Sequence, residues 1–188
     1  DTKIELSPFY LNSNITLNKQ NLNFLVDELI FAILNLNPDL LGNFNGDIKF
    51  LLTNIEHELI RNGSVSLNIS QKTINLTDVL LNIGNIGSIK TQIKYSEENG
   101  DTIFSSSNSL SIKNKNQFAK KFQIKLDKVK NINVINFKIE KNINTGLVSI
   151  FDIRINQDVK HVKKNGKSKY NIRNSQELKS LVKNIINS

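Results

Sequence analysis

The chain has 188 residues, of which 38% are apolar, and its formal net charge is +8. This length suits one domain with its own hydrophobic core, and the apolar fraction is well above that of a disordered chain. The sequence contains no cysteine, which excludes disulfide bonds, thiol catalysis and cysteine-ligated metals. Its apolar runs are far shorter than the roughly 20 residues that cross a bilayer as a helix, so no membrane-spanning helix is predicted.

Charge is divided unevenly along the chain. Residues 1–112 contain 7 Lys or Arg against 12 Asp or Glu, a net charge of −5, whereas residues 113–188 contain 18 against 5, a net charge of +13. The abundance of Asn, Ile and Lys indicates a genome of low GC content, but codon bias alone does not make one part acidic and the next basic. This excess of positive charge favours an anionic partner for the C-terminal part.

The first residues are predicted to form a strand followed by an apolar helix. Residues 1–17 contain short alternation and Pro8, which indicates an edge strand or arm because proline does not fit a central strand. Leucine, isoleucine and valine then recur at helical spacing over about 18–36, with phenylalanines on the other side, and Pro38 ends this helix. A helix that is apolar on nearly every side is expected to be buried.

A second helix is predicted after a Gly/Asn-rich loop over 42–46. Asp47 is a suitable N-cap, and Asn62-Gly63 is a suitable stop. A strand over 47–53 is the main alternative, because the same apolar residues fit either period.

From Ser64 onwards, apolar residues recur at every second position. Apolar side chains alternate with Ser, Asn, Gln and Lys in five segments, which is typical of antiparallel strands with one wet face. The turn sequences Glu97–Asp101, Asn144–Gly146 and Asn165-Gly166 separate strands, and a short helix is predicted over 77–82. The five predicted strands lie within 64–70, 89–95, 121–126, 135–139 and 151–155.

An amphipathic helix over about 175–186 ends the chain, with Asn174 as N-cap and Glu177 completing a capping box. The predicted fold class is α+β, with a long, curved, antiparallel β-meander packed on the apolar N-terminal helix and a short C-terminal amphipathic helix. We predict one domain over 1–188, made of an arm or edge strand (1–17), a helical segment (18–62), an antiparallel sheet (63–173) and the C-terminal helix (174–188).

No combination of residues predicts catalysis, a metal site or a cofactor, so we expect a protein that is not an enzyme. The histidines in Glu56-His57-Glu58 and at His161 lack the spacing of zinc ligands and are interpreted as surface side chains. Pro38-Asp39 with Asp47-x-Lys49 is similar to the acid–lysine core of metal-dependent nucleases. A helix stop and a helix cap explain these residues better.

Two glycines in Ile83–Lys90 are spaced as in the GxxG loop of KH domains, which clamps a nucleic-acid backbone. The loop has no basic residue, and residues 89–95 alternate like a strand rather than continuing as a helix. We therefore predict a glycine turn that leads into a strand. The serine run over 105–109 is predicted to mark a strand with a bulge, or a loop tip.

The lysines of the C-terminal part are the best candidates for a binding surface. They form either an electrostatic surface for an anionic partner or a solubilising face that discourages pairing between sheet edges. Arginine is rare, and Phe122, Phe137 and Phe151 are in phase with core isoleucines. Only Phe118 and Tyr170 then remain as aromatic side chains that could be exposed and stack on bases. Nucleic acid is therefore the less favoured partner. The candidate anion-binding residues are Lys121, Lys125, Lys160, Lys163, Lys164, Lys167, Lys169 and Arg173.

The sequence thus predicts a non-catalytic binding or structural module, secreted or displayed on a cell surface. Its partner would be an anionic macromolecule or surface, such as an acidic glycan, a membrane or a protein. The composition is similar to that of surface lipoproteins of low-GC bacteria without cell walls, and a first residue other than Met is expected of a processed chain. Two alternatives remain: a cytoplasmic nucleic-acid-associated protein that uses the basic hairpin 160–173, and a lipid-binding domain whose curved sheet surrounds an apolar helix.

Overall fold

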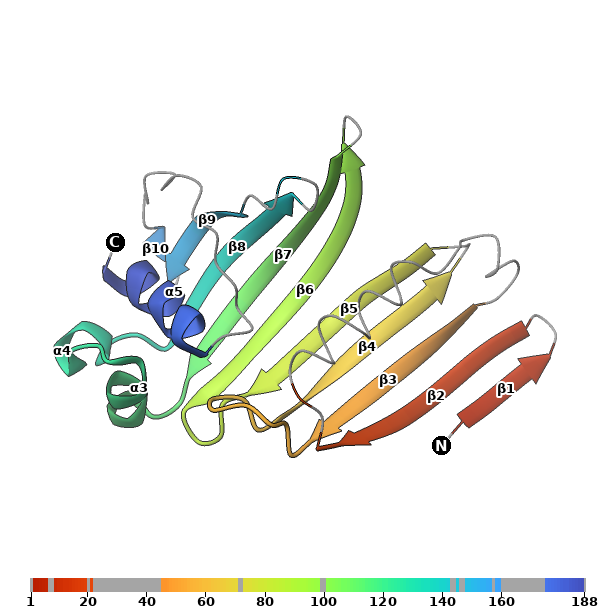
Figure 1. The fold of residues 1–188 in the computed structure, drawn as a ribbon, viewed down its shortest axis with the longest axis horizontal. Helices are drawn as coiled ribbons and strands as arrows, with labels where there is room; N and C mark the ends of the chain where they lie inside the picture. The colour runs from red at the N-terminus through yellow and green to blue at the C-terminus, as the bar shows by residue number, and fades with distance from the viewer. Residues whose placement is uncertain are drawn as a thin grey trace.

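A ten-stranded β-sheet forms most of the computed structural model of the chain, with its strands in sequence order from β1 to β10 (Figure 1). The structure describes residues 2–6, 9–19, 21, 45–70, 73–98, 101–142, 145, 148–156, 158–159 and 175–187. The strands are β1 (Thr2–Leu6), β2 (Phe9–Asn18), β3 (Asn45–Thr53), β4 (Asn62–Ser70), β5 (Thr73–Asn82), β6 (Gly87–Glu98), β7 (Asp101–Ile112), β8 (Val134–Asn142), β9 (Val148–Ile155) and β10 (Asp158–Val159).

Four of the five strands predicted from alternation are confirmed, those within 64–70, 89–95, 135–139 and 151–155. The fifth, over 121–126, is wrong, because Phe122 ends helix α3 (Lys115–Phe122) and Leu126 begins helix α4 (Leu126–Val129). The serine run 105–109 lies inside β7, which keeps an unbroken register with both neighbouring strands. The predicted bulge or loop tip is therefore wrong.

The helix predicted over 77–82 is also wrong, because these residues belong to β5. Strand β5 pairs antiparallel with β4, and its register shifts where Ser66 pairs with Asp78 and Leu67 pairs with Leu76. The extra residue of this bulge disturbs the period-two pattern and makes the sequence resemble a short helix.

Strand β3 replaces the second predicted helix, so the strand alternative over 47–53 is the correct one. Hydrogen-bonded neighbours on both sides, β2 and β4, fix these residues in the extended conformation. Tertiary pairing of this kind overrides a weak local preference for helix. After Thr53 the chain passes through an irregular loop, residues 54–61, to β4.

The N-terminal part also departs from a plain antiparallel meander. Strands β1 and β2 form an antiparallel pair, and β1 lies at the edge of the sheet. The edge strand predicted over 1–17 is therefore confirmed only for β1, because β2 has hydrogen-bonded neighbours on both sides. Strand β2 pairs with β3 in parallel, so the whole sheet is mixed. The antiparallel sheet predicted over 63–173 is confirmed, because the described strands from β4 to β10 all pair antiparallel. The apolar helix predicted over 18–36 lies outside the described residues except at its start, where Asn18 ends β2 and Asn21 forms an isolated bridge with Glu56.

Most strands of the sheet present one mainly apolar and one mainly polar face. One row of paired residues crosses the inner, apolar face: Leu52, Gly63, Leu81, Ile89, Leu110, Ile135 and Ile155. The next row crosses the outer, polar face: Leu51, Ser64, Leu80, Lys90, Ser109, Asn136 and Arg154. A slip of one residue would exchange the two rows, so burial of the inner face specifies the register.

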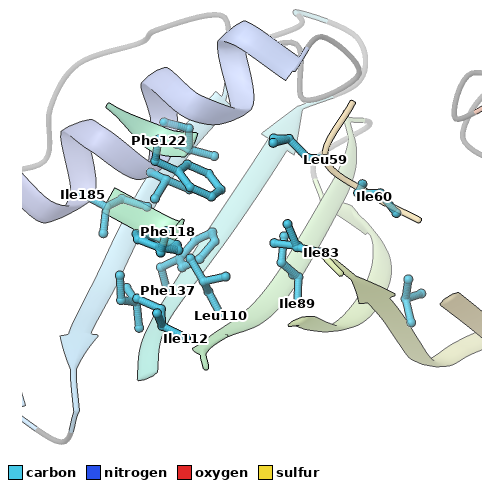
Figure 2. Packing of buried hydrophobic residues seen from close by; sticks show 14 of the residues in the cluster. Leu59, Ile60, Ile83, Ile89, Leu110, Ile112, Phe118, Phe122, Phe137 and Ile185 are labelled. Atoms are coloured by element: carbon cyan, nitrogen blue, oxygen red, sulfur yellow. The ribbon is translucent and has the colours of Figure 1, made fainter. Parts of the chain in front are cut away.

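The core lies between the inner face of the sheet and the helices that pack on it (Figures 1 and 2). Phe118 and Phe122 of α3 are 0% and 1% exposed, and their rings stack with centroids 4.4 Å apart. Helix α5 (Ser175–Asn187) confirms the predicted C-terminal helix and adds four buried apolar side chains, while the loop 54–61 adds three. These seven residues are Leu181, Val182, Ile185, Ile186, Ile55, Leu59 and Ile60.

Pairing between β5 and β6 is short. Four residue pairs join Val79–Asn82 to Ser88–Thr91, whereas twelve pairs join β6 to β7. Beyond the four pairs the strands diverge, as Figure 1 shows, and an ion pair of 3.0 Å between Asp78 and Lys90 lies at the point of divergence. The sheet therefore has two halves, β1–β5 and β6–β10, that meet along a short ladder.

Candidate anion-binding surface

A lysine-rich segment, residues 113–130, connects β7 to β8 and forms α3 and α4. It contains seven lysines and a single acidic residue, Asp127, which gives a net charge of +6. Figure 1 shows the two helices together beyond the end of the sheet where β7 passes into β8. We refer to residues 113–130 as the lysine cap.

Local signals at both ends define helix α3. The side chain of Asn114 accepts a hydrogen bond of 3.0 Å from the N–H of Gln117, which is the usual N-cap interaction. The helix ends at Gln123, which is left-handed with φ +54°, and the N–H of Ile124 donates to the carbonyl of Ala119 at 2.9 Å. Lys120 and Lys121 in the last turn lie near the negative end of the helix dipole, which stabilises them there.

Packing of the apolar residues directs the lysines outward. Phe118, Ala119 and Phe122 of α3 and Val129 of α4 are buried in the core. Residues on the other sides of these short helices face solvent, because a helix presents successive residues about 100° apart. Five of the seven lysines are exposed: Lys113, Lys120, Lys125, Lys128 and Lys130.

Two lysines of the cap have structural partners. Lys115 donates to the carbonyl of Ile132 and, at 2.6 Å, to the side-chain oxygen of Asn133. Lys121 forms an ion pair of 2.9 Å with Glu58. By contrast, no ion pair joins Lys113, Lys120, Lys125 or Lys130 to a residue that the structure describes. Within the described part of the chain these four cations therefore have no acidic partner, which makes them candidates for binding an external anion.

Two of the eight anion-binding residues predicted from the sequence, Lys121 and Lys125, therefore lie in the lysine cap. Lys125 is exposed just before α4, whereas Lys121 is half-buried and paired with Glu58. The other six lie outside the described residues: Lys160, Lys163, Lys164, Lys167, Lys169 and Arg173. The sequence-based selection missed Lys113, Lys120 and Lys130, although seven lysines among eighteen residues are a visible signal.

Aromatic side chains near the cap are buried. Phe122 and Phe137 lie in the core, as their phase predicts. The same prediction is wrong for Phe151, which pairs with Lys138 of the outer face because the register shifts between β8 and β9. Phe118 is 0% exposed, so its prediction as an exposed stacker is wrong. Tyr170 lies outside the described residues. The lysine cap thus offers charge without an aromatic surface on which a base could stack.

His57 has a structural role in the loop 54–61. Its Nδ1 accepts the N–H of Leu59 at 3.2 Å and the N–H of Ile60 at 3.1 Å, which leaves the proton of the neutral ring on Nε2. That buried Nε2 has no hydrogen-bond partner among the described residues. Loss of hydration lowers the pKa of His57 below 6.5, although the nearby Glu58 carboxylate opposes this effect. The interpretation as a surface histidine is therefore wrong for His57, and His161 lies outside the described residues.

Asp47, the acid of the nuclease-like sequence, is engaged within the sheet. Asn68 donates to its Oδ1 at 2.8 Å, and the hydroxyl of Tyr10 donates to its Oδ2. These two hydrogen bonds, that of Asn68 foremost, hold the pKa of Asp47 below its usual value. Asp39 lies outside the described residues. The carboxylate thus links three neighbouring strands across their outer face.

The glycines of Ile83–Lys90 form the predicted turn into a strand. Gly84 has φ +54°, which favours glycine, and the N–H of Ile86 donates to the carbonyl of Ile83 at 3.1 Å. Gly87 then begins β6. The KH-like interpretation is not needed, because a structural turn accounts for both glycines.

Another group of charges lies on the outer face around β9, in an open hollow lined by residues of β6–β9. Asp152 forms ion pairs with Lys138 at 2.8 Å and with Arg154 at 3.2 Å. The backbone of Asp152 is left-handed, with φ +54°, and lies at a break in register between β8 and β9. The hydrogen bond from Lys138 contributes most to lowering the pKa of Asp152. One carboxylate thus offsets part of the charge of these two cations, so the hollow is a weaker anion site than the lysine cap.

Searches for related proteins gave no match to a family model, to a curated protein or to a solved structure. Within the described ranges, no group of three His, Asp or Glu side chains is arranged to hold a metal ion. Among the described helices, none has the length and apolar character to cross a membrane.

Proposed function

We propose that this chain is a non-catalytic binding module, secreted or displayed on a cell surface, whose positively charged C-terminal part binds an anionic partner. The observation that carries the proposal is the lysine cap. Four of its five exposed lysines, Lys113, Lys120, Lys125 and Lys130, have no ion-pair partner in the described part of the chain. A phosphate, sulfate or carboxylate surface would supply the missing counter-charge.

A purely solubilising role explains the cap less well. Surfaces that only keep a protein in solution carry charges of both signs side by side. The cap instead combines seven lysines with one aspartate and lies beyond the end of the sheet (Figure 1). Two exposed lysines elsewhere in the described structure, Lys90 and Lys138, are paired with carboxylates.

Retention on a heparin column tests the proposal. A first variant has Lys113, Lys120, Lys125 and Lys130 all changed to Gln. It should elute at a clearly lower salt concentration than the unaltered chain, because a surface with fewer cations releases fewer counterions from heparin when it binds. A matched control changes Lys49, Lys90, Lys138 and Arg154 to Gln, which removes the same charge from the outer face of the sheet.

The two variants together separate a local site from net charge. Equal shifts for both would show that retention depends on total charge and would contradict a site at the cap. An unchanged elution of the cap variant would do the same. The predicted hairpin is tested in parallel with Lys163, Lys164, Lys167 and Lys169 changed to Gln, and the nucleic-acid alternative with the same variants on immobilised DNA.

A further inference from the structure

Leu126 is an exposed leucine inside the lysine cap. It begins α4, and 46% of its surface is accessible, although the next turn of the same helix buries Val129 completely. Lys125 precedes it and Lys128 follows it on the same short helix, and both are exposed. An apolar side chain is thus held in solvent among cations.

From this arrangement we infer that the lysine cap docks the protein on an anionic lipid surface, with Leu126 entering the interface between headgroups and acyl chains. The inference rests on the proposed anion-binding function and names the partner. Lysine ammonium groups bind the phosphates and carboxylates of the headgroups, while the leucine is withdrawn from water. Either contribution alone gives weak, reversible binding, and the combination strengthens it.

Side-chain chemistry favours lipid over nucleic acid. The lysine cap contains no arginine, which is the residue that binds phosphates with paired hydrogen bonds. Its two phenylalanines, Phe118 and Phe122, are buried and cannot stack on bases. A leucine next to solvated ammonium groups matches a bilayer interface, where apolar and charged groups lie within a few ångströms of each other.

The position of α4 also favours a broad, flat partner. Figure 1 shows α4 at the periphery of the molecule, beyond α3 and away from the strands. Residue 125 is extended, with φ −63° and ψ 136°, so the chain turns into α4 immediately before the leucine. A planar surface can therefore approach Leu126 and its neighbouring lysines.

Vesicle sedimentation tests the partner. The chain should bind vesicles of phosphatidylcholine with about 30% phosphatidylserine, and should bind pure phosphatidylcholine vesicles much more weakly. Changing Lys120, Lys125 and Lys130 to Gln should lower the partition into anionic vesicles roughly 100-fold, because each lysine near such a surface contributes about a fivefold factor. Changing Lys49, Lys90 and Lys138 to Gln serves as the control and should change partition by less than about tenfold.

Insertion of the leucine is tested with tryptophan, because the chain contains none of its own. Leu126→Trp should show a blue-shifted emission on anionic vesicles and quenching by lipids brominated on their acyl chains. Leu80→Trp is the matched control: Leu80 is exposed to a similar degree, 37%, but lies on the outer face of the sheet. Its emission should not change. Leu126→Gln should weaken vesicle binding about tenfold.

Three results would overturn the inference. Retention on heparin that depends on the cap, without binding to anionic vesicles, would leave the proposed function standing and exclude lipid as the partner. Vesicle binding with no change in Leu126→Trp emission would exclude insertion. Tighter binding to DNA than to vesicles at about 0.1 M salt, lost in the cap variant, would assign the surface to nucleic acid.

Discussion

Glu58 and Lys179 are 121 residues apart in the sequence, yet their side chains form an ion pair of 2.8 Å. Lys121 approaches the same carboxylate to 2.9 Å, so one acid of the loop 54–61 holds a lysine from α3 and another from α5. These contacts fasten the loop whose Leu59 and Ile60 complete the core. They also neutralise part of the basic C-terminal charge with an acid from the N-terminal part.

Glu58→Gln should increase retention on heparin while slightly lowering stability. The substitution frees Lys121, whose side chain is 36% exposed, for an external anion, whereas Lys179 is only 12% exposed and gains less. Because the Glu58 side chain is 43% exposed, the free energy of unfolding should fall by about 1 kcal/mol or less, and less again at high salt. Salt-gradient elution and urea unfolding measure the two effects. Asp78→Asn, which frees the distant Lys90, is the control, and an equal gain in retention for it would refute a local effect.

Phe118→Ala should destabilise the protein severely. Phe118 is fully buried and stacks on Phe122, so truncation leaves a cavity between α3 and the sheet that costs about 3–5 kcal/mol. Urea unfolding followed by circular dichroism measures the loss. Phe118→Leu keeps most of the volume and should lose less than about 2 kcal/mol. Equal losses for the two variants would show that the cavity is not the cause.

Stability should fall on mild acidification because of His57. Burial lowers the pKa of this histidine in the folded state below its ordinary value of 6.5, so the unfolded chain binds the proton more readily. The contribution of neutral His57 is complete above pH 6.5 and is lost as the pH falls through the lowered value. Protonation would also place a hydrogen on Nδ1, which now accepts two backbone N–H groups.

His57→Asn provides the test of this pH dependence. The asparagine oxygen can accept the same N–H groups but does not titrate, so the variant should keep a flatter stability profile just below pH 6.5. Unfolding by urea at a series of pH values gives the comparison. Parallel profiles for the two proteins would contradict the role assigned to His57.

Gly87→Ala should cost more stability than Gly84→Ala. A Cβ at Gly87 would overlap the backbone carbonyl of Ser111 in the neighbouring strand, so the β6–β7 ladder would have to shift, at a cost of about 2–3 kcal/mol. A Cβ at Gly84 meets open space, and the cost there is the left-handed backbone, about 1 kcal/mol. Thermal unfolding ranks the two. Gly84→Asn should be tolerated better than Gly84→Ala, since asparagine adopts this conformation more readily.

Period-two alternation predicted strands where the inner residues of a segment are all apolar, as in 65–69 of β4 and 135–139 of β8. The prediction failed where the apolar residues of a short segment fit both the helix period and the strand period. Ile48, Leu51 and Leu52 fit a helix spacing, and Phe50 with Leu52 fits a strand, so the choice depends on pairing with β2 and β4. Parallel pairing of β2 with β3 was not predictable, because nothing local in either strand specifies a partner so far along the chain.

The candidate site was predictable in composition but not in geometry. Phe122 and Leu126 alternate with lysines like residues of a strand, yet the left-handed Gln123 stops α3 between them. Their lysines consequently lie on helices beyond the end of the sheet rather than on its wet face. Charge counting also gave no sign that Lys121 is paired, because its partner Glu58 comes from a distant loop.

Because the β5–β6 ladder is short, the two halves of the sheet are expected to be only weakly coupled in local unfolding. Separating β5 from β6 breaks four residue pairs and exposes less surface than separating the strands of any long hairpin. Local opening is therefore expected mainly at this ladder. Backbone amides of Ser88–Thr91 that point toward β5 should exchange with deuterium earlier than those that join β6 to β7. Any movement of one half of the sheet against the other is therefore expected at this ladder, where the ion pair of Asp78 and Lys90 adds one further contact.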